Sequence, residues 1–439
     1  MSPASTPSFV ESLRVAAPYI HEHRGSTFVV VVGGEAARGD ALLGLAADLA
    51  LLQAFGVRVV LVHGDRPQIE RRLRDRHAKS RFVGDLRVTD AVALEAAHEA
   101  VGATRARFER ALSAGIANTP MAGARVRVVS GNFVTAKPIG VRDGVDYQFT
   151  GEVRRIDVEA VKGLLEMRAL VLISPLGVSP TGESFNLHSH DVAQRVAIAI
   201  GADKLIALVE GRGVVDPRRR LIQQLTPAEA DALVSQKHLQ GTDVRLHLKA
   251  AAAAVRGGVR RAHLVDRRRD GALIEELFTR DGSGTLVSAE AYEDMRPAKL
   301  SDVGPLAALL RPLEDEGILI RRGRARLEVE LDRFVVLERD GMIIGCTALE
   351  PMIEDKIGEL YCVAMLESYR ETGRGAALLE FMEERARKLG LERVFLLTTR
   401  SAHFFQERGY KPSSVRQLPA ARRASYDRRR RSRVLMKEL

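Results

Sequence analysis

The stretch Arg370-Glu-Thr-Gly-Arg-Gly-Ala-Ala-Leu-Leu379 lies between a strand-like segment and a helix-like segment. Residues 357–366, before it, are mostly apolar and contain no proline, which is typical of a buried strand. After it, apolar residues recur at helical spacing as far as Leu389, with charged residues between them. Gly373 and Gly375 let the backbone turn sharply, and the first N–H groups of the helix favour an anionic phosphate. The stretch therefore predicts a phosphate-binding turn between a strand and a helix.

The Arg-x-x-Gly-x-Gly pattern of this turn resembles the pyrophosphate loop of the GNAT acyltransferases, which hold acetyl-coenzyme A there. An ordinary helix-entry turn is the structural alternative. The pattern lacks the Gly-Lys-Ser/Thr of a P-loop, which argues against nucleotide hydrolysis. Acetyl-CoA is therefore the expected co-substrate. The resemblance implies that it is held by Arg370, Glu371, Thr372, Gly373, Arg374, Gly375 and Ala376, with Cys362 and Val363 on the preceding strand.

The composition favours anionic ligands. The net charge is +10 and the pI about 9.8, and much of the excess lies in the arginines of residues 422–433. Aromatic residues make up only 5% of the chain and tryptophan is absent, so a nucleic-acid platform has little support. Cys346 and Cys362 are the two cysteines, which excludes a disulfide framework and a cysteine-rich zinc site; no metal is expected. No secretory signal or membrane-spanning run is visible, so a cytoplasmic location without membrane association is expected.

The first part of the chain predicts an α/β fold. An amphipathic helix is expected at residues 9–20, followed by a strand at 27–32, a Gly-Gly turn, a helix at 41–55 and a strand at 57–62. This order predicts a right-handed βαβ unit. The remaining predicted strands are 124–129, 169–173, 204–209 and 261–265, and the remaining predicted helices are 91–113, 157–167 and 191–200. We therefore expect an open, mostly parallel sheet with helices on both faces.

A second pattern follows residues 283–287, after a predicted linker at 288–296. It comprises a helix at 303–310 and two strands, 333–339 and 342–349, joined by Asp340-Gly341, a strong hairpin signal. The stretch around Gly373 comes next, then a strand at 393–398, a helix at 402–408 and a strand at 434–436. That order resembles the small mixed α/β fold of the GNAT family.

Further segments carry a resemblance along nearly the whole chain. They are Ala17-Pro-Tyr-Ile20, His23-Arg-Gly25, Gly33-Gly-Glu-Ala36, Arg66-Pro-Gln68, Val129-Ser-Gly-Asn-Phe133, Gly144-Val-Asp-Tyr147, Ser179-Pro-Thr-Gly-Glu-Ser-Phe-Asn186, Asp270-Gly-Ala-Leu273, Glu276-Leu-Phe-Thr279, Arg311-Pro-Leu313, Thr398-Thr-Arg-Ser401 and Gln406-Glu-Arg-Gly409. With both halves in view, the chain resembles the bacterial N-acetylglutamate synthase family, in which an amino-acid-kinase-type domain precedes a GNAT domain.

The family resemblance implies an organisation and a function. It implies an N-terminal helix (1–24), an amino-acid-kinase-like domain (25–287), the linker (288–296) and a GNAT domain (297–439). It also implies acetyl transfer from acetyl-CoA to L-glutamate, the first step of arginine biosynthesis, with L-arginine as feedback inhibitor. A homo-oligomer is expected, with a hexamer as one candidate.

Val31 departs from the pattern of active amino-acid kinases. Kinases of the acetylglutamate type carry a lysine two residues before the Gly-Gly turn, where it neutralises phosphate charge. A neutral side chain cannot compensate the charge on a transferring phosphoryl group. We therefore interpret the first domain as catalytically silent, kept as a scaffold and arginine sensor, with Gly33 and Gly34 in a structural role.

The resemblance also implies roles for individual residues of the second domain. Glutamate's carboxylates would be held by Arg321, Lys356, Arg430 and Ser432, with backbone groups of Leu319 and Cys362. Glu359 would be the general base, through water, and the Val363 N–H would stabilise the oxyanion. Thr398 would lie near the leaving sulfur; many GNAT enzymes use a tyrosine in the next helix, where this chain has Phe404 and Phe405. Cys362 suggests an acetyl-cysteine intermediate, but a small buried strand residue is the preferred interpretation, so we favour direct attack.

Arginine-sensitive members of the superfamily bind arginine beside the N-terminal helix. The corresponding residues here are Tyr19, His263, Glu276, Phe278, Ser283 and Gly284. Glu276 would accept a hydrogen bond from the guanidinium, and the N-terminal helix would pack against a neighbouring subunit.

Three alternative functions have less support in the sequence. A phosphotransferase acting on acetylglutamate is disfavoured by Val31. An arginine sensor with a decayed acetyltransferase is disfavoured by the intact residues 370–375, Lys356 and Glu359. A nucleic-acid binder rests on net charge alone and would show a steep salt dependence.

Overall fold

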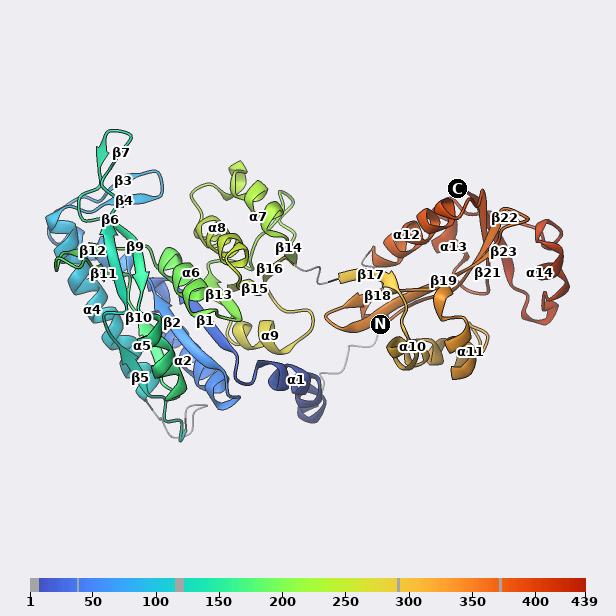
Figure 1. The fold of residues 1–439 in the computed structure, drawn as a ribbon, viewed down its shortest axis with the longest axis horizontal. Coiled ribbons are helices and arrows are strands. Elements are labelled where there is room, and N and C mark those ends of the chain that lie inside the picture. The colour runs from blue at the N-terminus through green and yellow to red at the C-terminus, as the bar shows by residue number, and fades with distance from the viewer. Residues whose placement is uncertain (1–7, 38, 115–121, 290–292, 371–372) are drawn as a thin grey trace. The chain divides into compact units, whose positions relative to one another are not determined.

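The computed structural model describes residues 8–37, 39–114, 122–289, 293–370 and 373–439. The chain divides into two compact units, residues 1–290 and 291–439, each with its own sheet and its own hydrophobic cores (Figure 1). The boundary between them falls within the predicted linker.

The described helices of the first unit are α1 (Phe9–His23), α2 (Gly39–Ala54), α3 (Arg66–Asp75), α4 (Ala91–Ser113), α5 (Val158–Glu166), α6 (Ser189–Ile200), α7 (Pro227–Val234), α8 (Asp243–Arg256) and α9 (Ala272–Phe278). The strands are β1 (Thr27–Val32), β2 (Arg58–His63), β3 (Arg81–Val83), β4 (Leu86–Val88), β5 (Val128–Ser130), β6 (Val134–Pro138), β7 (Val141–Arg142), β8 (Val145–Asp146), β9 (Gly151–Ile156), β10 (Leu170–Ile173), β11 (Leu176–Val178), β12 (Ser184–Asn186), β13 (Lys204–Val209), β14 (Gln224–Leu225), β15 (Arg261–Asp266) and β16 (Thr285–Ser288).

An open sheet forms the centre of the first unit. Across the described residues its eight strands have the order β14-β16-β15-β13-β1-β2-β10-β5, and neighbouring strands are parallel except β15 and β16. β1 is buried along its whole length, as expected for a parallel strand covered on both faces. Its side chains alternate between two cores, with Val29 and Val31 in one and Phe28, Val30 and Val32 in the other.

Helices cover both faces of this sheet. The core that holds Val31 also contains residues of α5, α6 and α8, whereas the other core contains residues of α2, α9, the end of α4 and Tyr19 of α1. The predicted fold class is therefore confirmed. Val31 itself is 1% exposed among apolar side chains, so it presents no charged group at the Gly-Gly turn.

The strands of the second unit are β17 (Glu293–Pro297), β18 (Phe334–Arg339), β19 (Met342–Met352), β20 (Ile357–Met365), β21 (Arg393–Thr398), β22 (Lys411–Ser413) and β23 (Arg433–Glu438). Its described helices are α10 (Val303–Asp315), α11 (Arg324–Val329), α12 (Arg374–Lys388), α13 (Ala402–Gln406) and α14 (Ala420–Ala424).

One twisted sheet carries the second unit. Its seven described strands have the order β17-β18-β19-β20-β21-β23-β22, and only β20 and β21 pair in parallel. α12 and α13 pack on one face, and α10 and α11 pack on the other. In a further, smaller cluster, Leu418 packs with Ile357, Phe395 and Val434.

Three sequence-based assignments need correction. Residues 293–296 of the predicted linker belong to β17, which pairs antiparallel with β18; its charged, partly exposed residues are typical of an edge strand. The strand predicted at 124–129 is shorter and shifted, since β5 comprises residues 128–130. α8 was not predicted, although its sequence is amphipathic.

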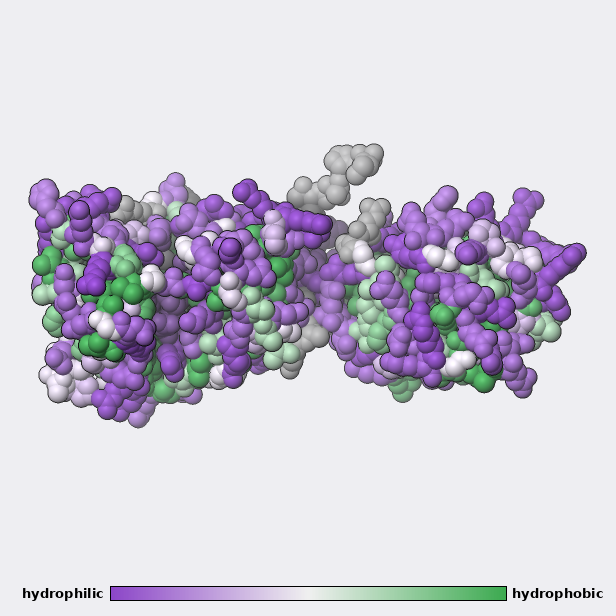
Figure 2. Space-filling view, turned by 90° about the horizontal axis from the view of Figure 1, so that it is seen from above, coloured by the Kyte–Doolittle hydropathy of each residue, from purple (hydrophilic) through white to green (hydrophobic). Residues whose placement is uncertain are grey.

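Hydrophilic side chains cover most of the face of both units seen in Figure 2, with apolar groups in scattered patches. Within the described ranges, no helix combines the length and apolarity needed to cross a membrane.

Candidate functional site

The predicted phosphate-binding turn leads directly into α12. Gly373 is the N-cap residue, with a φ of +82° that L side chains rarely adopt, and its carbonyl accepts hydrogen bonds from Ala376 (3.0 Å) and Ala377 (3.2 Å). The first turn of a helix leaves N–H groups without intrahelical acceptors, which suits a phosphate. A Cβ atom added to Gly375 would lie 3.3 Å from the Phe404 ring. Glu371 and Thr372, also predicted as cofactor ligands, lie outside the described residues.

The arginine side chains of this turn are held by protein groups. Arg370 donates from Nε to the Met365 carbonyl (3.3 Å), and Arg374 donates from Nε to both carboxylate oxygens of Glu293 (2.9 and 3.0 Å). Burial alone would raise the pKa of Glu293, but its bonds to Arg374 and Arg339 lower it. β17 therefore anchors the start of α12. With both arginine side chains engaged, the backbone N–H groups are the hydrogen-bond donors that the turn offers to a phosphate.

A β-bulge interrupts β20 just before the turn. The register with β19 shifts between Cys346 and Ala348, and Cys362 has a φ of +50°. Pairing with β21 ends at Leu360 opposite Leu396, although β20 continues to Met365. The two parallel strands thus stop pairing at their carboxyl ends, and the predicted oxyanion donor, Val363, lies in the stretch of β20 that is no longer paired with β21.

Glu359 lies on β20 and is 9% exposed. Its two carboxylate oxygens accept hydrogen bonds from Arg422 of α14, from Nε at 2.5 Å and from a terminal nitrogen at 2.9 Å. Glu350 lies directly opposite on β19 and pairs with Arg333. The predicted base is therefore held in a two-point ion pair with Arg422, a partner that the sequence did not reveal.

The carboxylate-binding residues predicted near the C-terminus meet the loop after α10. Arg430 donates to the carbonyls of Gly317 (3.0 Å) and Ile318 (2.9 Å), next to Leu319. Ser432 directly precedes β23, whose residue Arg433 pairs with Thr398 of β21. The structure thus brings Leu319, Arg430 and Ser432 to the end of the sheet where β20 and β21 diverge.

Arg321 lies in the same loop, but its side chain is 78% exposed and paired with Asp315 at 2.8 Å. Its neighbour Arg322 points inward to Glu330 and stacks over the Tyr361 ring at 4.8 Å. Arg322 thus points inward and Arg321 faces solvent.

Lys356 does not lie with the other predicted ligands. It precedes the start of β20, six residues before Cys362, which is about 20 Å along a strand. Its side chain is 62% exposed and pairs with Glu392 at 2.6 Å, which raises the pKa of the lysine. The prediction that Lys356 binds a carboxylate together with Arg430 is therefore wrong on geometric grounds.

Thr398 and Cys362 have distinct surroundings. The Thr398 hydroxyl accepts hydrogen bonds from the N–H groups of Arg400 (3.3 Å) and Ser401 (3.0 Å), which leaves its own proton for donation. Burial raises the pKa of the Cys362 thiol to about 11, so the nucleophilic thiolate is scarce near neutral pH. This favours direct attack over an acetyl-cysteine intermediate.

In the first unit, the predicted arginine-binding residues form a buried network. Glu276 accepts hydrogen bonds from His263 Nδ1 (2.7 Å) and from the N–H groups of Ser283 (2.5 Å) and Gly284 (2.7 Å). Burial alone would raise the pKa of Glu276, but these bonds lower it. His263 is also buried, which lowers its pKa. The carboxylate is therefore charged and fixed, and with three of its about four acceptor sites in use it can accept one further hydrogen bond.

α1 reaches this network through His23. Nε2 of His23 hydrogen-bonds the Leu277 carbonyl of α9 at 2.9 Å, and its ring packs against Phe278 (5.6 Å between centroids) and Tyr19 (6.3 Å). His23 thus places Tyr19 of α1 close to Phe278 of α9. His23 was named only in the segment His23-Arg-Gly25 and was not assigned to the arginine site.

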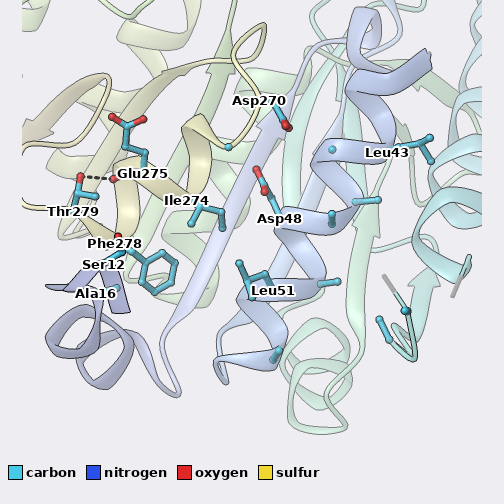
Figure 3. A pocket seen from close by; sticks show the side chains of 18 of the residues that line it. Ser12, Ala16, Leu43, Asp48, Leu51, Asp270, Ile274, Glu275, Phe278 and Thr279 are labelled. Atoms are coloured by element: carbon cyan, nitrogen blue, oxygen red, sulfur yellow. Dashed lines mark hydrogen bonds between the residues drawn. The ribbon is translucent and has the colours of Figure 1, made fainter. Parts of the chain in front are cut away.

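A cavity of about 1130 Å³ lies between α1, α2 and α9 (Figure 3). Its walls are mainly apolar and include Ala16, Leu51 and Phe278. Asp48 and Asp270 point toward one another at one end, and burial together with Asp270 raises the pKa of Asp48 to about 7. The spacing of the alanines in α2 did not predict this cavity.

Among the described residues, no group of three or more His, Cys, Asp or Glu side chains is arranged to hold a metal ion.

Comparisons with known proteins cover both units. Residues 26–266 match the amino acid kinase family, and residues 305–410 match the acetyltransferase (GNAT) family. The chain is 51% identical to an amino-acid acetyltransferase of Pseudomonas aeruginosa over 436 residues, which is 99% of this chain and 100% of the relative. N-acetylglutamate synthase from Neisseria gonorrhoeae, complexed with coenzyme A and L-arginine, is 38% identical and covers 99% of this chain and 100% of its own, with a TM-score of 0.85. Its complex with coenzyme A and N-acetyl-glutamate has the same identity and coverage and a TM-score of 0.63.

Proposed function

This chain belongs to the amino-acid acetyltransferase family and is an acyltransferase, and on that premise we propose that it transfers the acetyl group of acetyl-CoA to the α-amine of L-glutamate. The product would be N-acetylglutamate, which opens arginine biosynthesis. One observation carries the proposal: the phosphate-binding turn, the bulge of β20 and the guanidinium of Arg430 all lie toward the end of the sheet where β20 and β21 diverge. The cytoplasm, where both substrates occur, is the proposed location.

The start of α12 is the proposed acetyl-CoA site. Backbone N–H groups beginning at Gly373 would bind the pyrophosphate, because the positive end of the helix dipole faces the ligand there. The acetyl group would then lie between the separated ends of β20 and β21. Val363 N–H would donate to the thioester carbonyl and stabilise the negative charge that develops on its oxygen.

On the acceptor side, Arg430 and Ser432 would bind a glutamate carboxylate, with backbone groups of Leu319 and Cys362, and Arg321 would close on the second carboxylate. Glu359, acting through a water molecule, would take the proton from the ammonium. The freed amine lone pair would attack the thioester carbon, forming the amide bond as the C–S bond breaks. The Thr398 hydroxyl would hydrogen-bond the departing thiolate.

A thiol-release assay with acetyl-CoA and a panel of amino acids tests this function. We expect glutamate to be the preferred acceptor and glutamine to be poor, because it lacks one carboxylate charge. Equal rates with glutamate and glutamine would contradict the carboxylate pocket. ATP-dependent acylphosphate formation without coenzyme A would instead indicate a phosphotransferase.

Arg430→Met is expected to raise KM for glutamate by about tenfold to hundredfold, because charge-assisted hydrogen bonds contribute about 1.5–3 kcal/mol. KM for acetyl-CoA should change little. Lys356→Met is the matched control, since it removes an equal charge from the far end of β20. If Lys356→Met weakened glutamate as strongly as Arg430→Met, the acceptor would lie elsewhere on the sheet.

The first unit is proposed to be a silent kinase domain that senses L-arginine. The carboxylate of Glu276, already fixed by three hydrogen bonds, has the charge to accept a guanidinium beside Tyr19 and Phe278. Arginine would inhibit by binding one arrangement of the protein more tightly than another, since binding both equally shifts nothing.

Glu276→Gln is expected to raise the arginine concentration for half-inhibition at least about tenfold, because it removes a charged acceptor. Uninhibited turnover should stay unchanged, since the acetyl-transfer residues belong to the other unit. Glu275→Gln is the control: this neighbour is partly exposed and pairs with Arg269. Equal loss of inhibition in both variants would refute a specific role for Glu276.

A homo-oligomer, with a hexamer as one candidate, is the proposed assembly, and α1 is its proposed contact. Four apolar side chains of α1 are 48–79% exposed to solvent: Phe9, Val10, Leu13 and Val15. Several exposed apolar side chains on one helix are typical of a surface that contacts another protein chain. Leu13→Asp should therefore reduce the sedimentation coefficient, whereas Val329→Asp, at an exposed apolar residue of α11, should not. An unchanged assembly in Leu13→Asp would exclude this contact.

A further inference from the structure

The base of the proposed reaction is held by a side chain from far along the sequence. Both carboxylate oxygens of Glu359 are occupied by Arg422, at 2.5 and 2.9 Å, and both side chains are largely buried, at 12% and 18% exposed. We propose that Arg422 is the positioning residue of the reaction: it orients Glu359 toward the acceptor amine. This inference rests on the proposed acetyl transfer to glutamate.

The geometry of the pair favours a positioning role. A guanidinium that donates two hydrogen bonds to one carboxylate fixes the plane of that carboxylate as well as its place, which a single contact does not. The third nitrogen of Arg422 has only long contacts, to the Ser425 carbonyl (3.5 Å) and hydroxyl (3.3 Å). Glu359 is therefore the principal partner of Arg422, and no second carboxylate in the described residues competes for it.

The segment that carries Arg422 also carries the acceptor ligands. Residues 414–432 connect β22 to β23, and Leu418 packs on Ile357 and Phe395, immediately beside Glu359 in the sheet. At the other end of the segment, the Tyr426 hydroxyl donates to the Ser432 carbonyl (2.7 Å). Arg430 ties the segment to the loop that contains Leu319.

This connection links the base to substrate recognition. The carboxylates of glutamate would be read by Arg430 and Ser432, and the same segment sets the direction of Glu359 through Arg422. Glutamate bound to Arg430 would then have its amine aligned with Glu359. Residues 414–432 would set both the position of the substrate and the orientation of the base. Misplacement of a reacting group by about 1 Å is enough to cost on the order of 10²-fold in rate.

A double-mutant cycle in the full-length protein tests the inference. Arg422→Met is expected to lower kcat for glutamate about tenfold to hundredfold with KM for acetyl-CoA unchanged. In a Glu359→Gln background, the same substitution should lower kcat by less than about threefold, because a residue that acts through Glu359 has nothing left to position. Equal losses in both backgrounds would show a general structural role and overturn the proposal.

Two further variants keep the cycle decisive. Arg422→Lys retains the charge but makes one contact instead of two. Its kcat should therefore fall between those of the wild type and Arg422→Met. If Arg422→Met does not fold, Arg422→Lys replaces it in the cycle. Arg423→Met is the control, because it removes the neighbouring exposed arginine, whose side chain donates to the Arg416 carbonyl. It should leave kcat unchanged. A loss in Arg423→Met as large as in Arg422→Met would overturn the proposal. A wild-type protein inactive on glutamate would instead refute the proposed function itself.

Discussion

Replacing Glu359 with glutamine is expected to lower kcat for glutamate acetylation by about 10²–10⁴-fold, the range that general acid–base catalysis typically supplies. Glutamine keeps the shape of the side chain but cannot accept the proton of the substrate ammonium. The loss should shrink as pH rises, because more of the free glutamate then arrives with a deprotonated amine. Initial rates of thiol release across a pH series, at saturating acetyl-CoA, measure both effects.

Glu350→Gln provides the control for this substitution. Glu350 lies directly opposite Glu359 on β19 and is also paired with an arginine, so the variant changes the same chemical group on the same face of the sheet. Its kcat should remain near that of the wild type. A loss below about threefold in Glu359→Gln would assign the base to another residue.

The second large effect is expected at the start of α12, where Gly373→Val should raise KM for acetyl-CoA by about tenfold to hundredfold. The φ of +82° at Gly373 is unfavourable for any L residue and most unfavourable for a β-branched one. The first helical turn would shift, and charge-assisted N–H contacts to the pyrophosphate, worth about 1.5–3 kcal/mol each, would be weakened. Arginine binding by the first unit, measured by calorimetry, should be unaffected.

Gly341→Val separates this effect from backbone strain in general. Gly341 lies in the turn between β18 and β19 with a φ of +76°, and a Cβ atom there would meet no neighbour within 4 Å. The control should lose stability without a selective change in KM for acetyl-CoA. Unchanged acetyl-CoA kinetics in a folded Gly373→Val variant would remove this turn from the site.

The fold could be predicted because its strongest signals are local. The run at residues 27–32 followed by Gly33 and Gly34, and the Asp340-Gly341 hairpin, depend on side-chain periodicity and turn chemistry within a few residues. β17 was missed because its pairing with β18 is formed across about 40 residues, while its own sequence is that of a charged, exposed edge. Local patterns carry no information about such a partner.

The same division explains the outcome for the site. The turn before α12 and the bulged strand β20 were found from a contiguous stretch, with Glu359 and Val363 assigned from the family resemblance. Arg422 was counted only as part of a basic C-terminal segment, since nothing near it in sequence indicates a carboxylate 63 residues away. Lys356 was misplaced for the opposite reason: a short distance along the chain becomes about 20 Å when the intervening residues are extended.

The position of β23 has a consequence for how the protein is made. Its residues 433–438 pair with residues 393–398 of β21 on one side, and β22 pairs on the other, so the described strand with the highest residue numbers lies inside the sheet and not at its edge. A domain generally folds as a unit, and the N-terminal one does so first during translation. The first unit, whose last strand ends at Ser288, can therefore fold while translation continues. The acetyl-transfer sheet cannot close until residues 433–438 have left the ribosome. A nascent chain stalled short of them would carry the proposed arginine-binding unit before it carried the proposed acetyl-transfer activity.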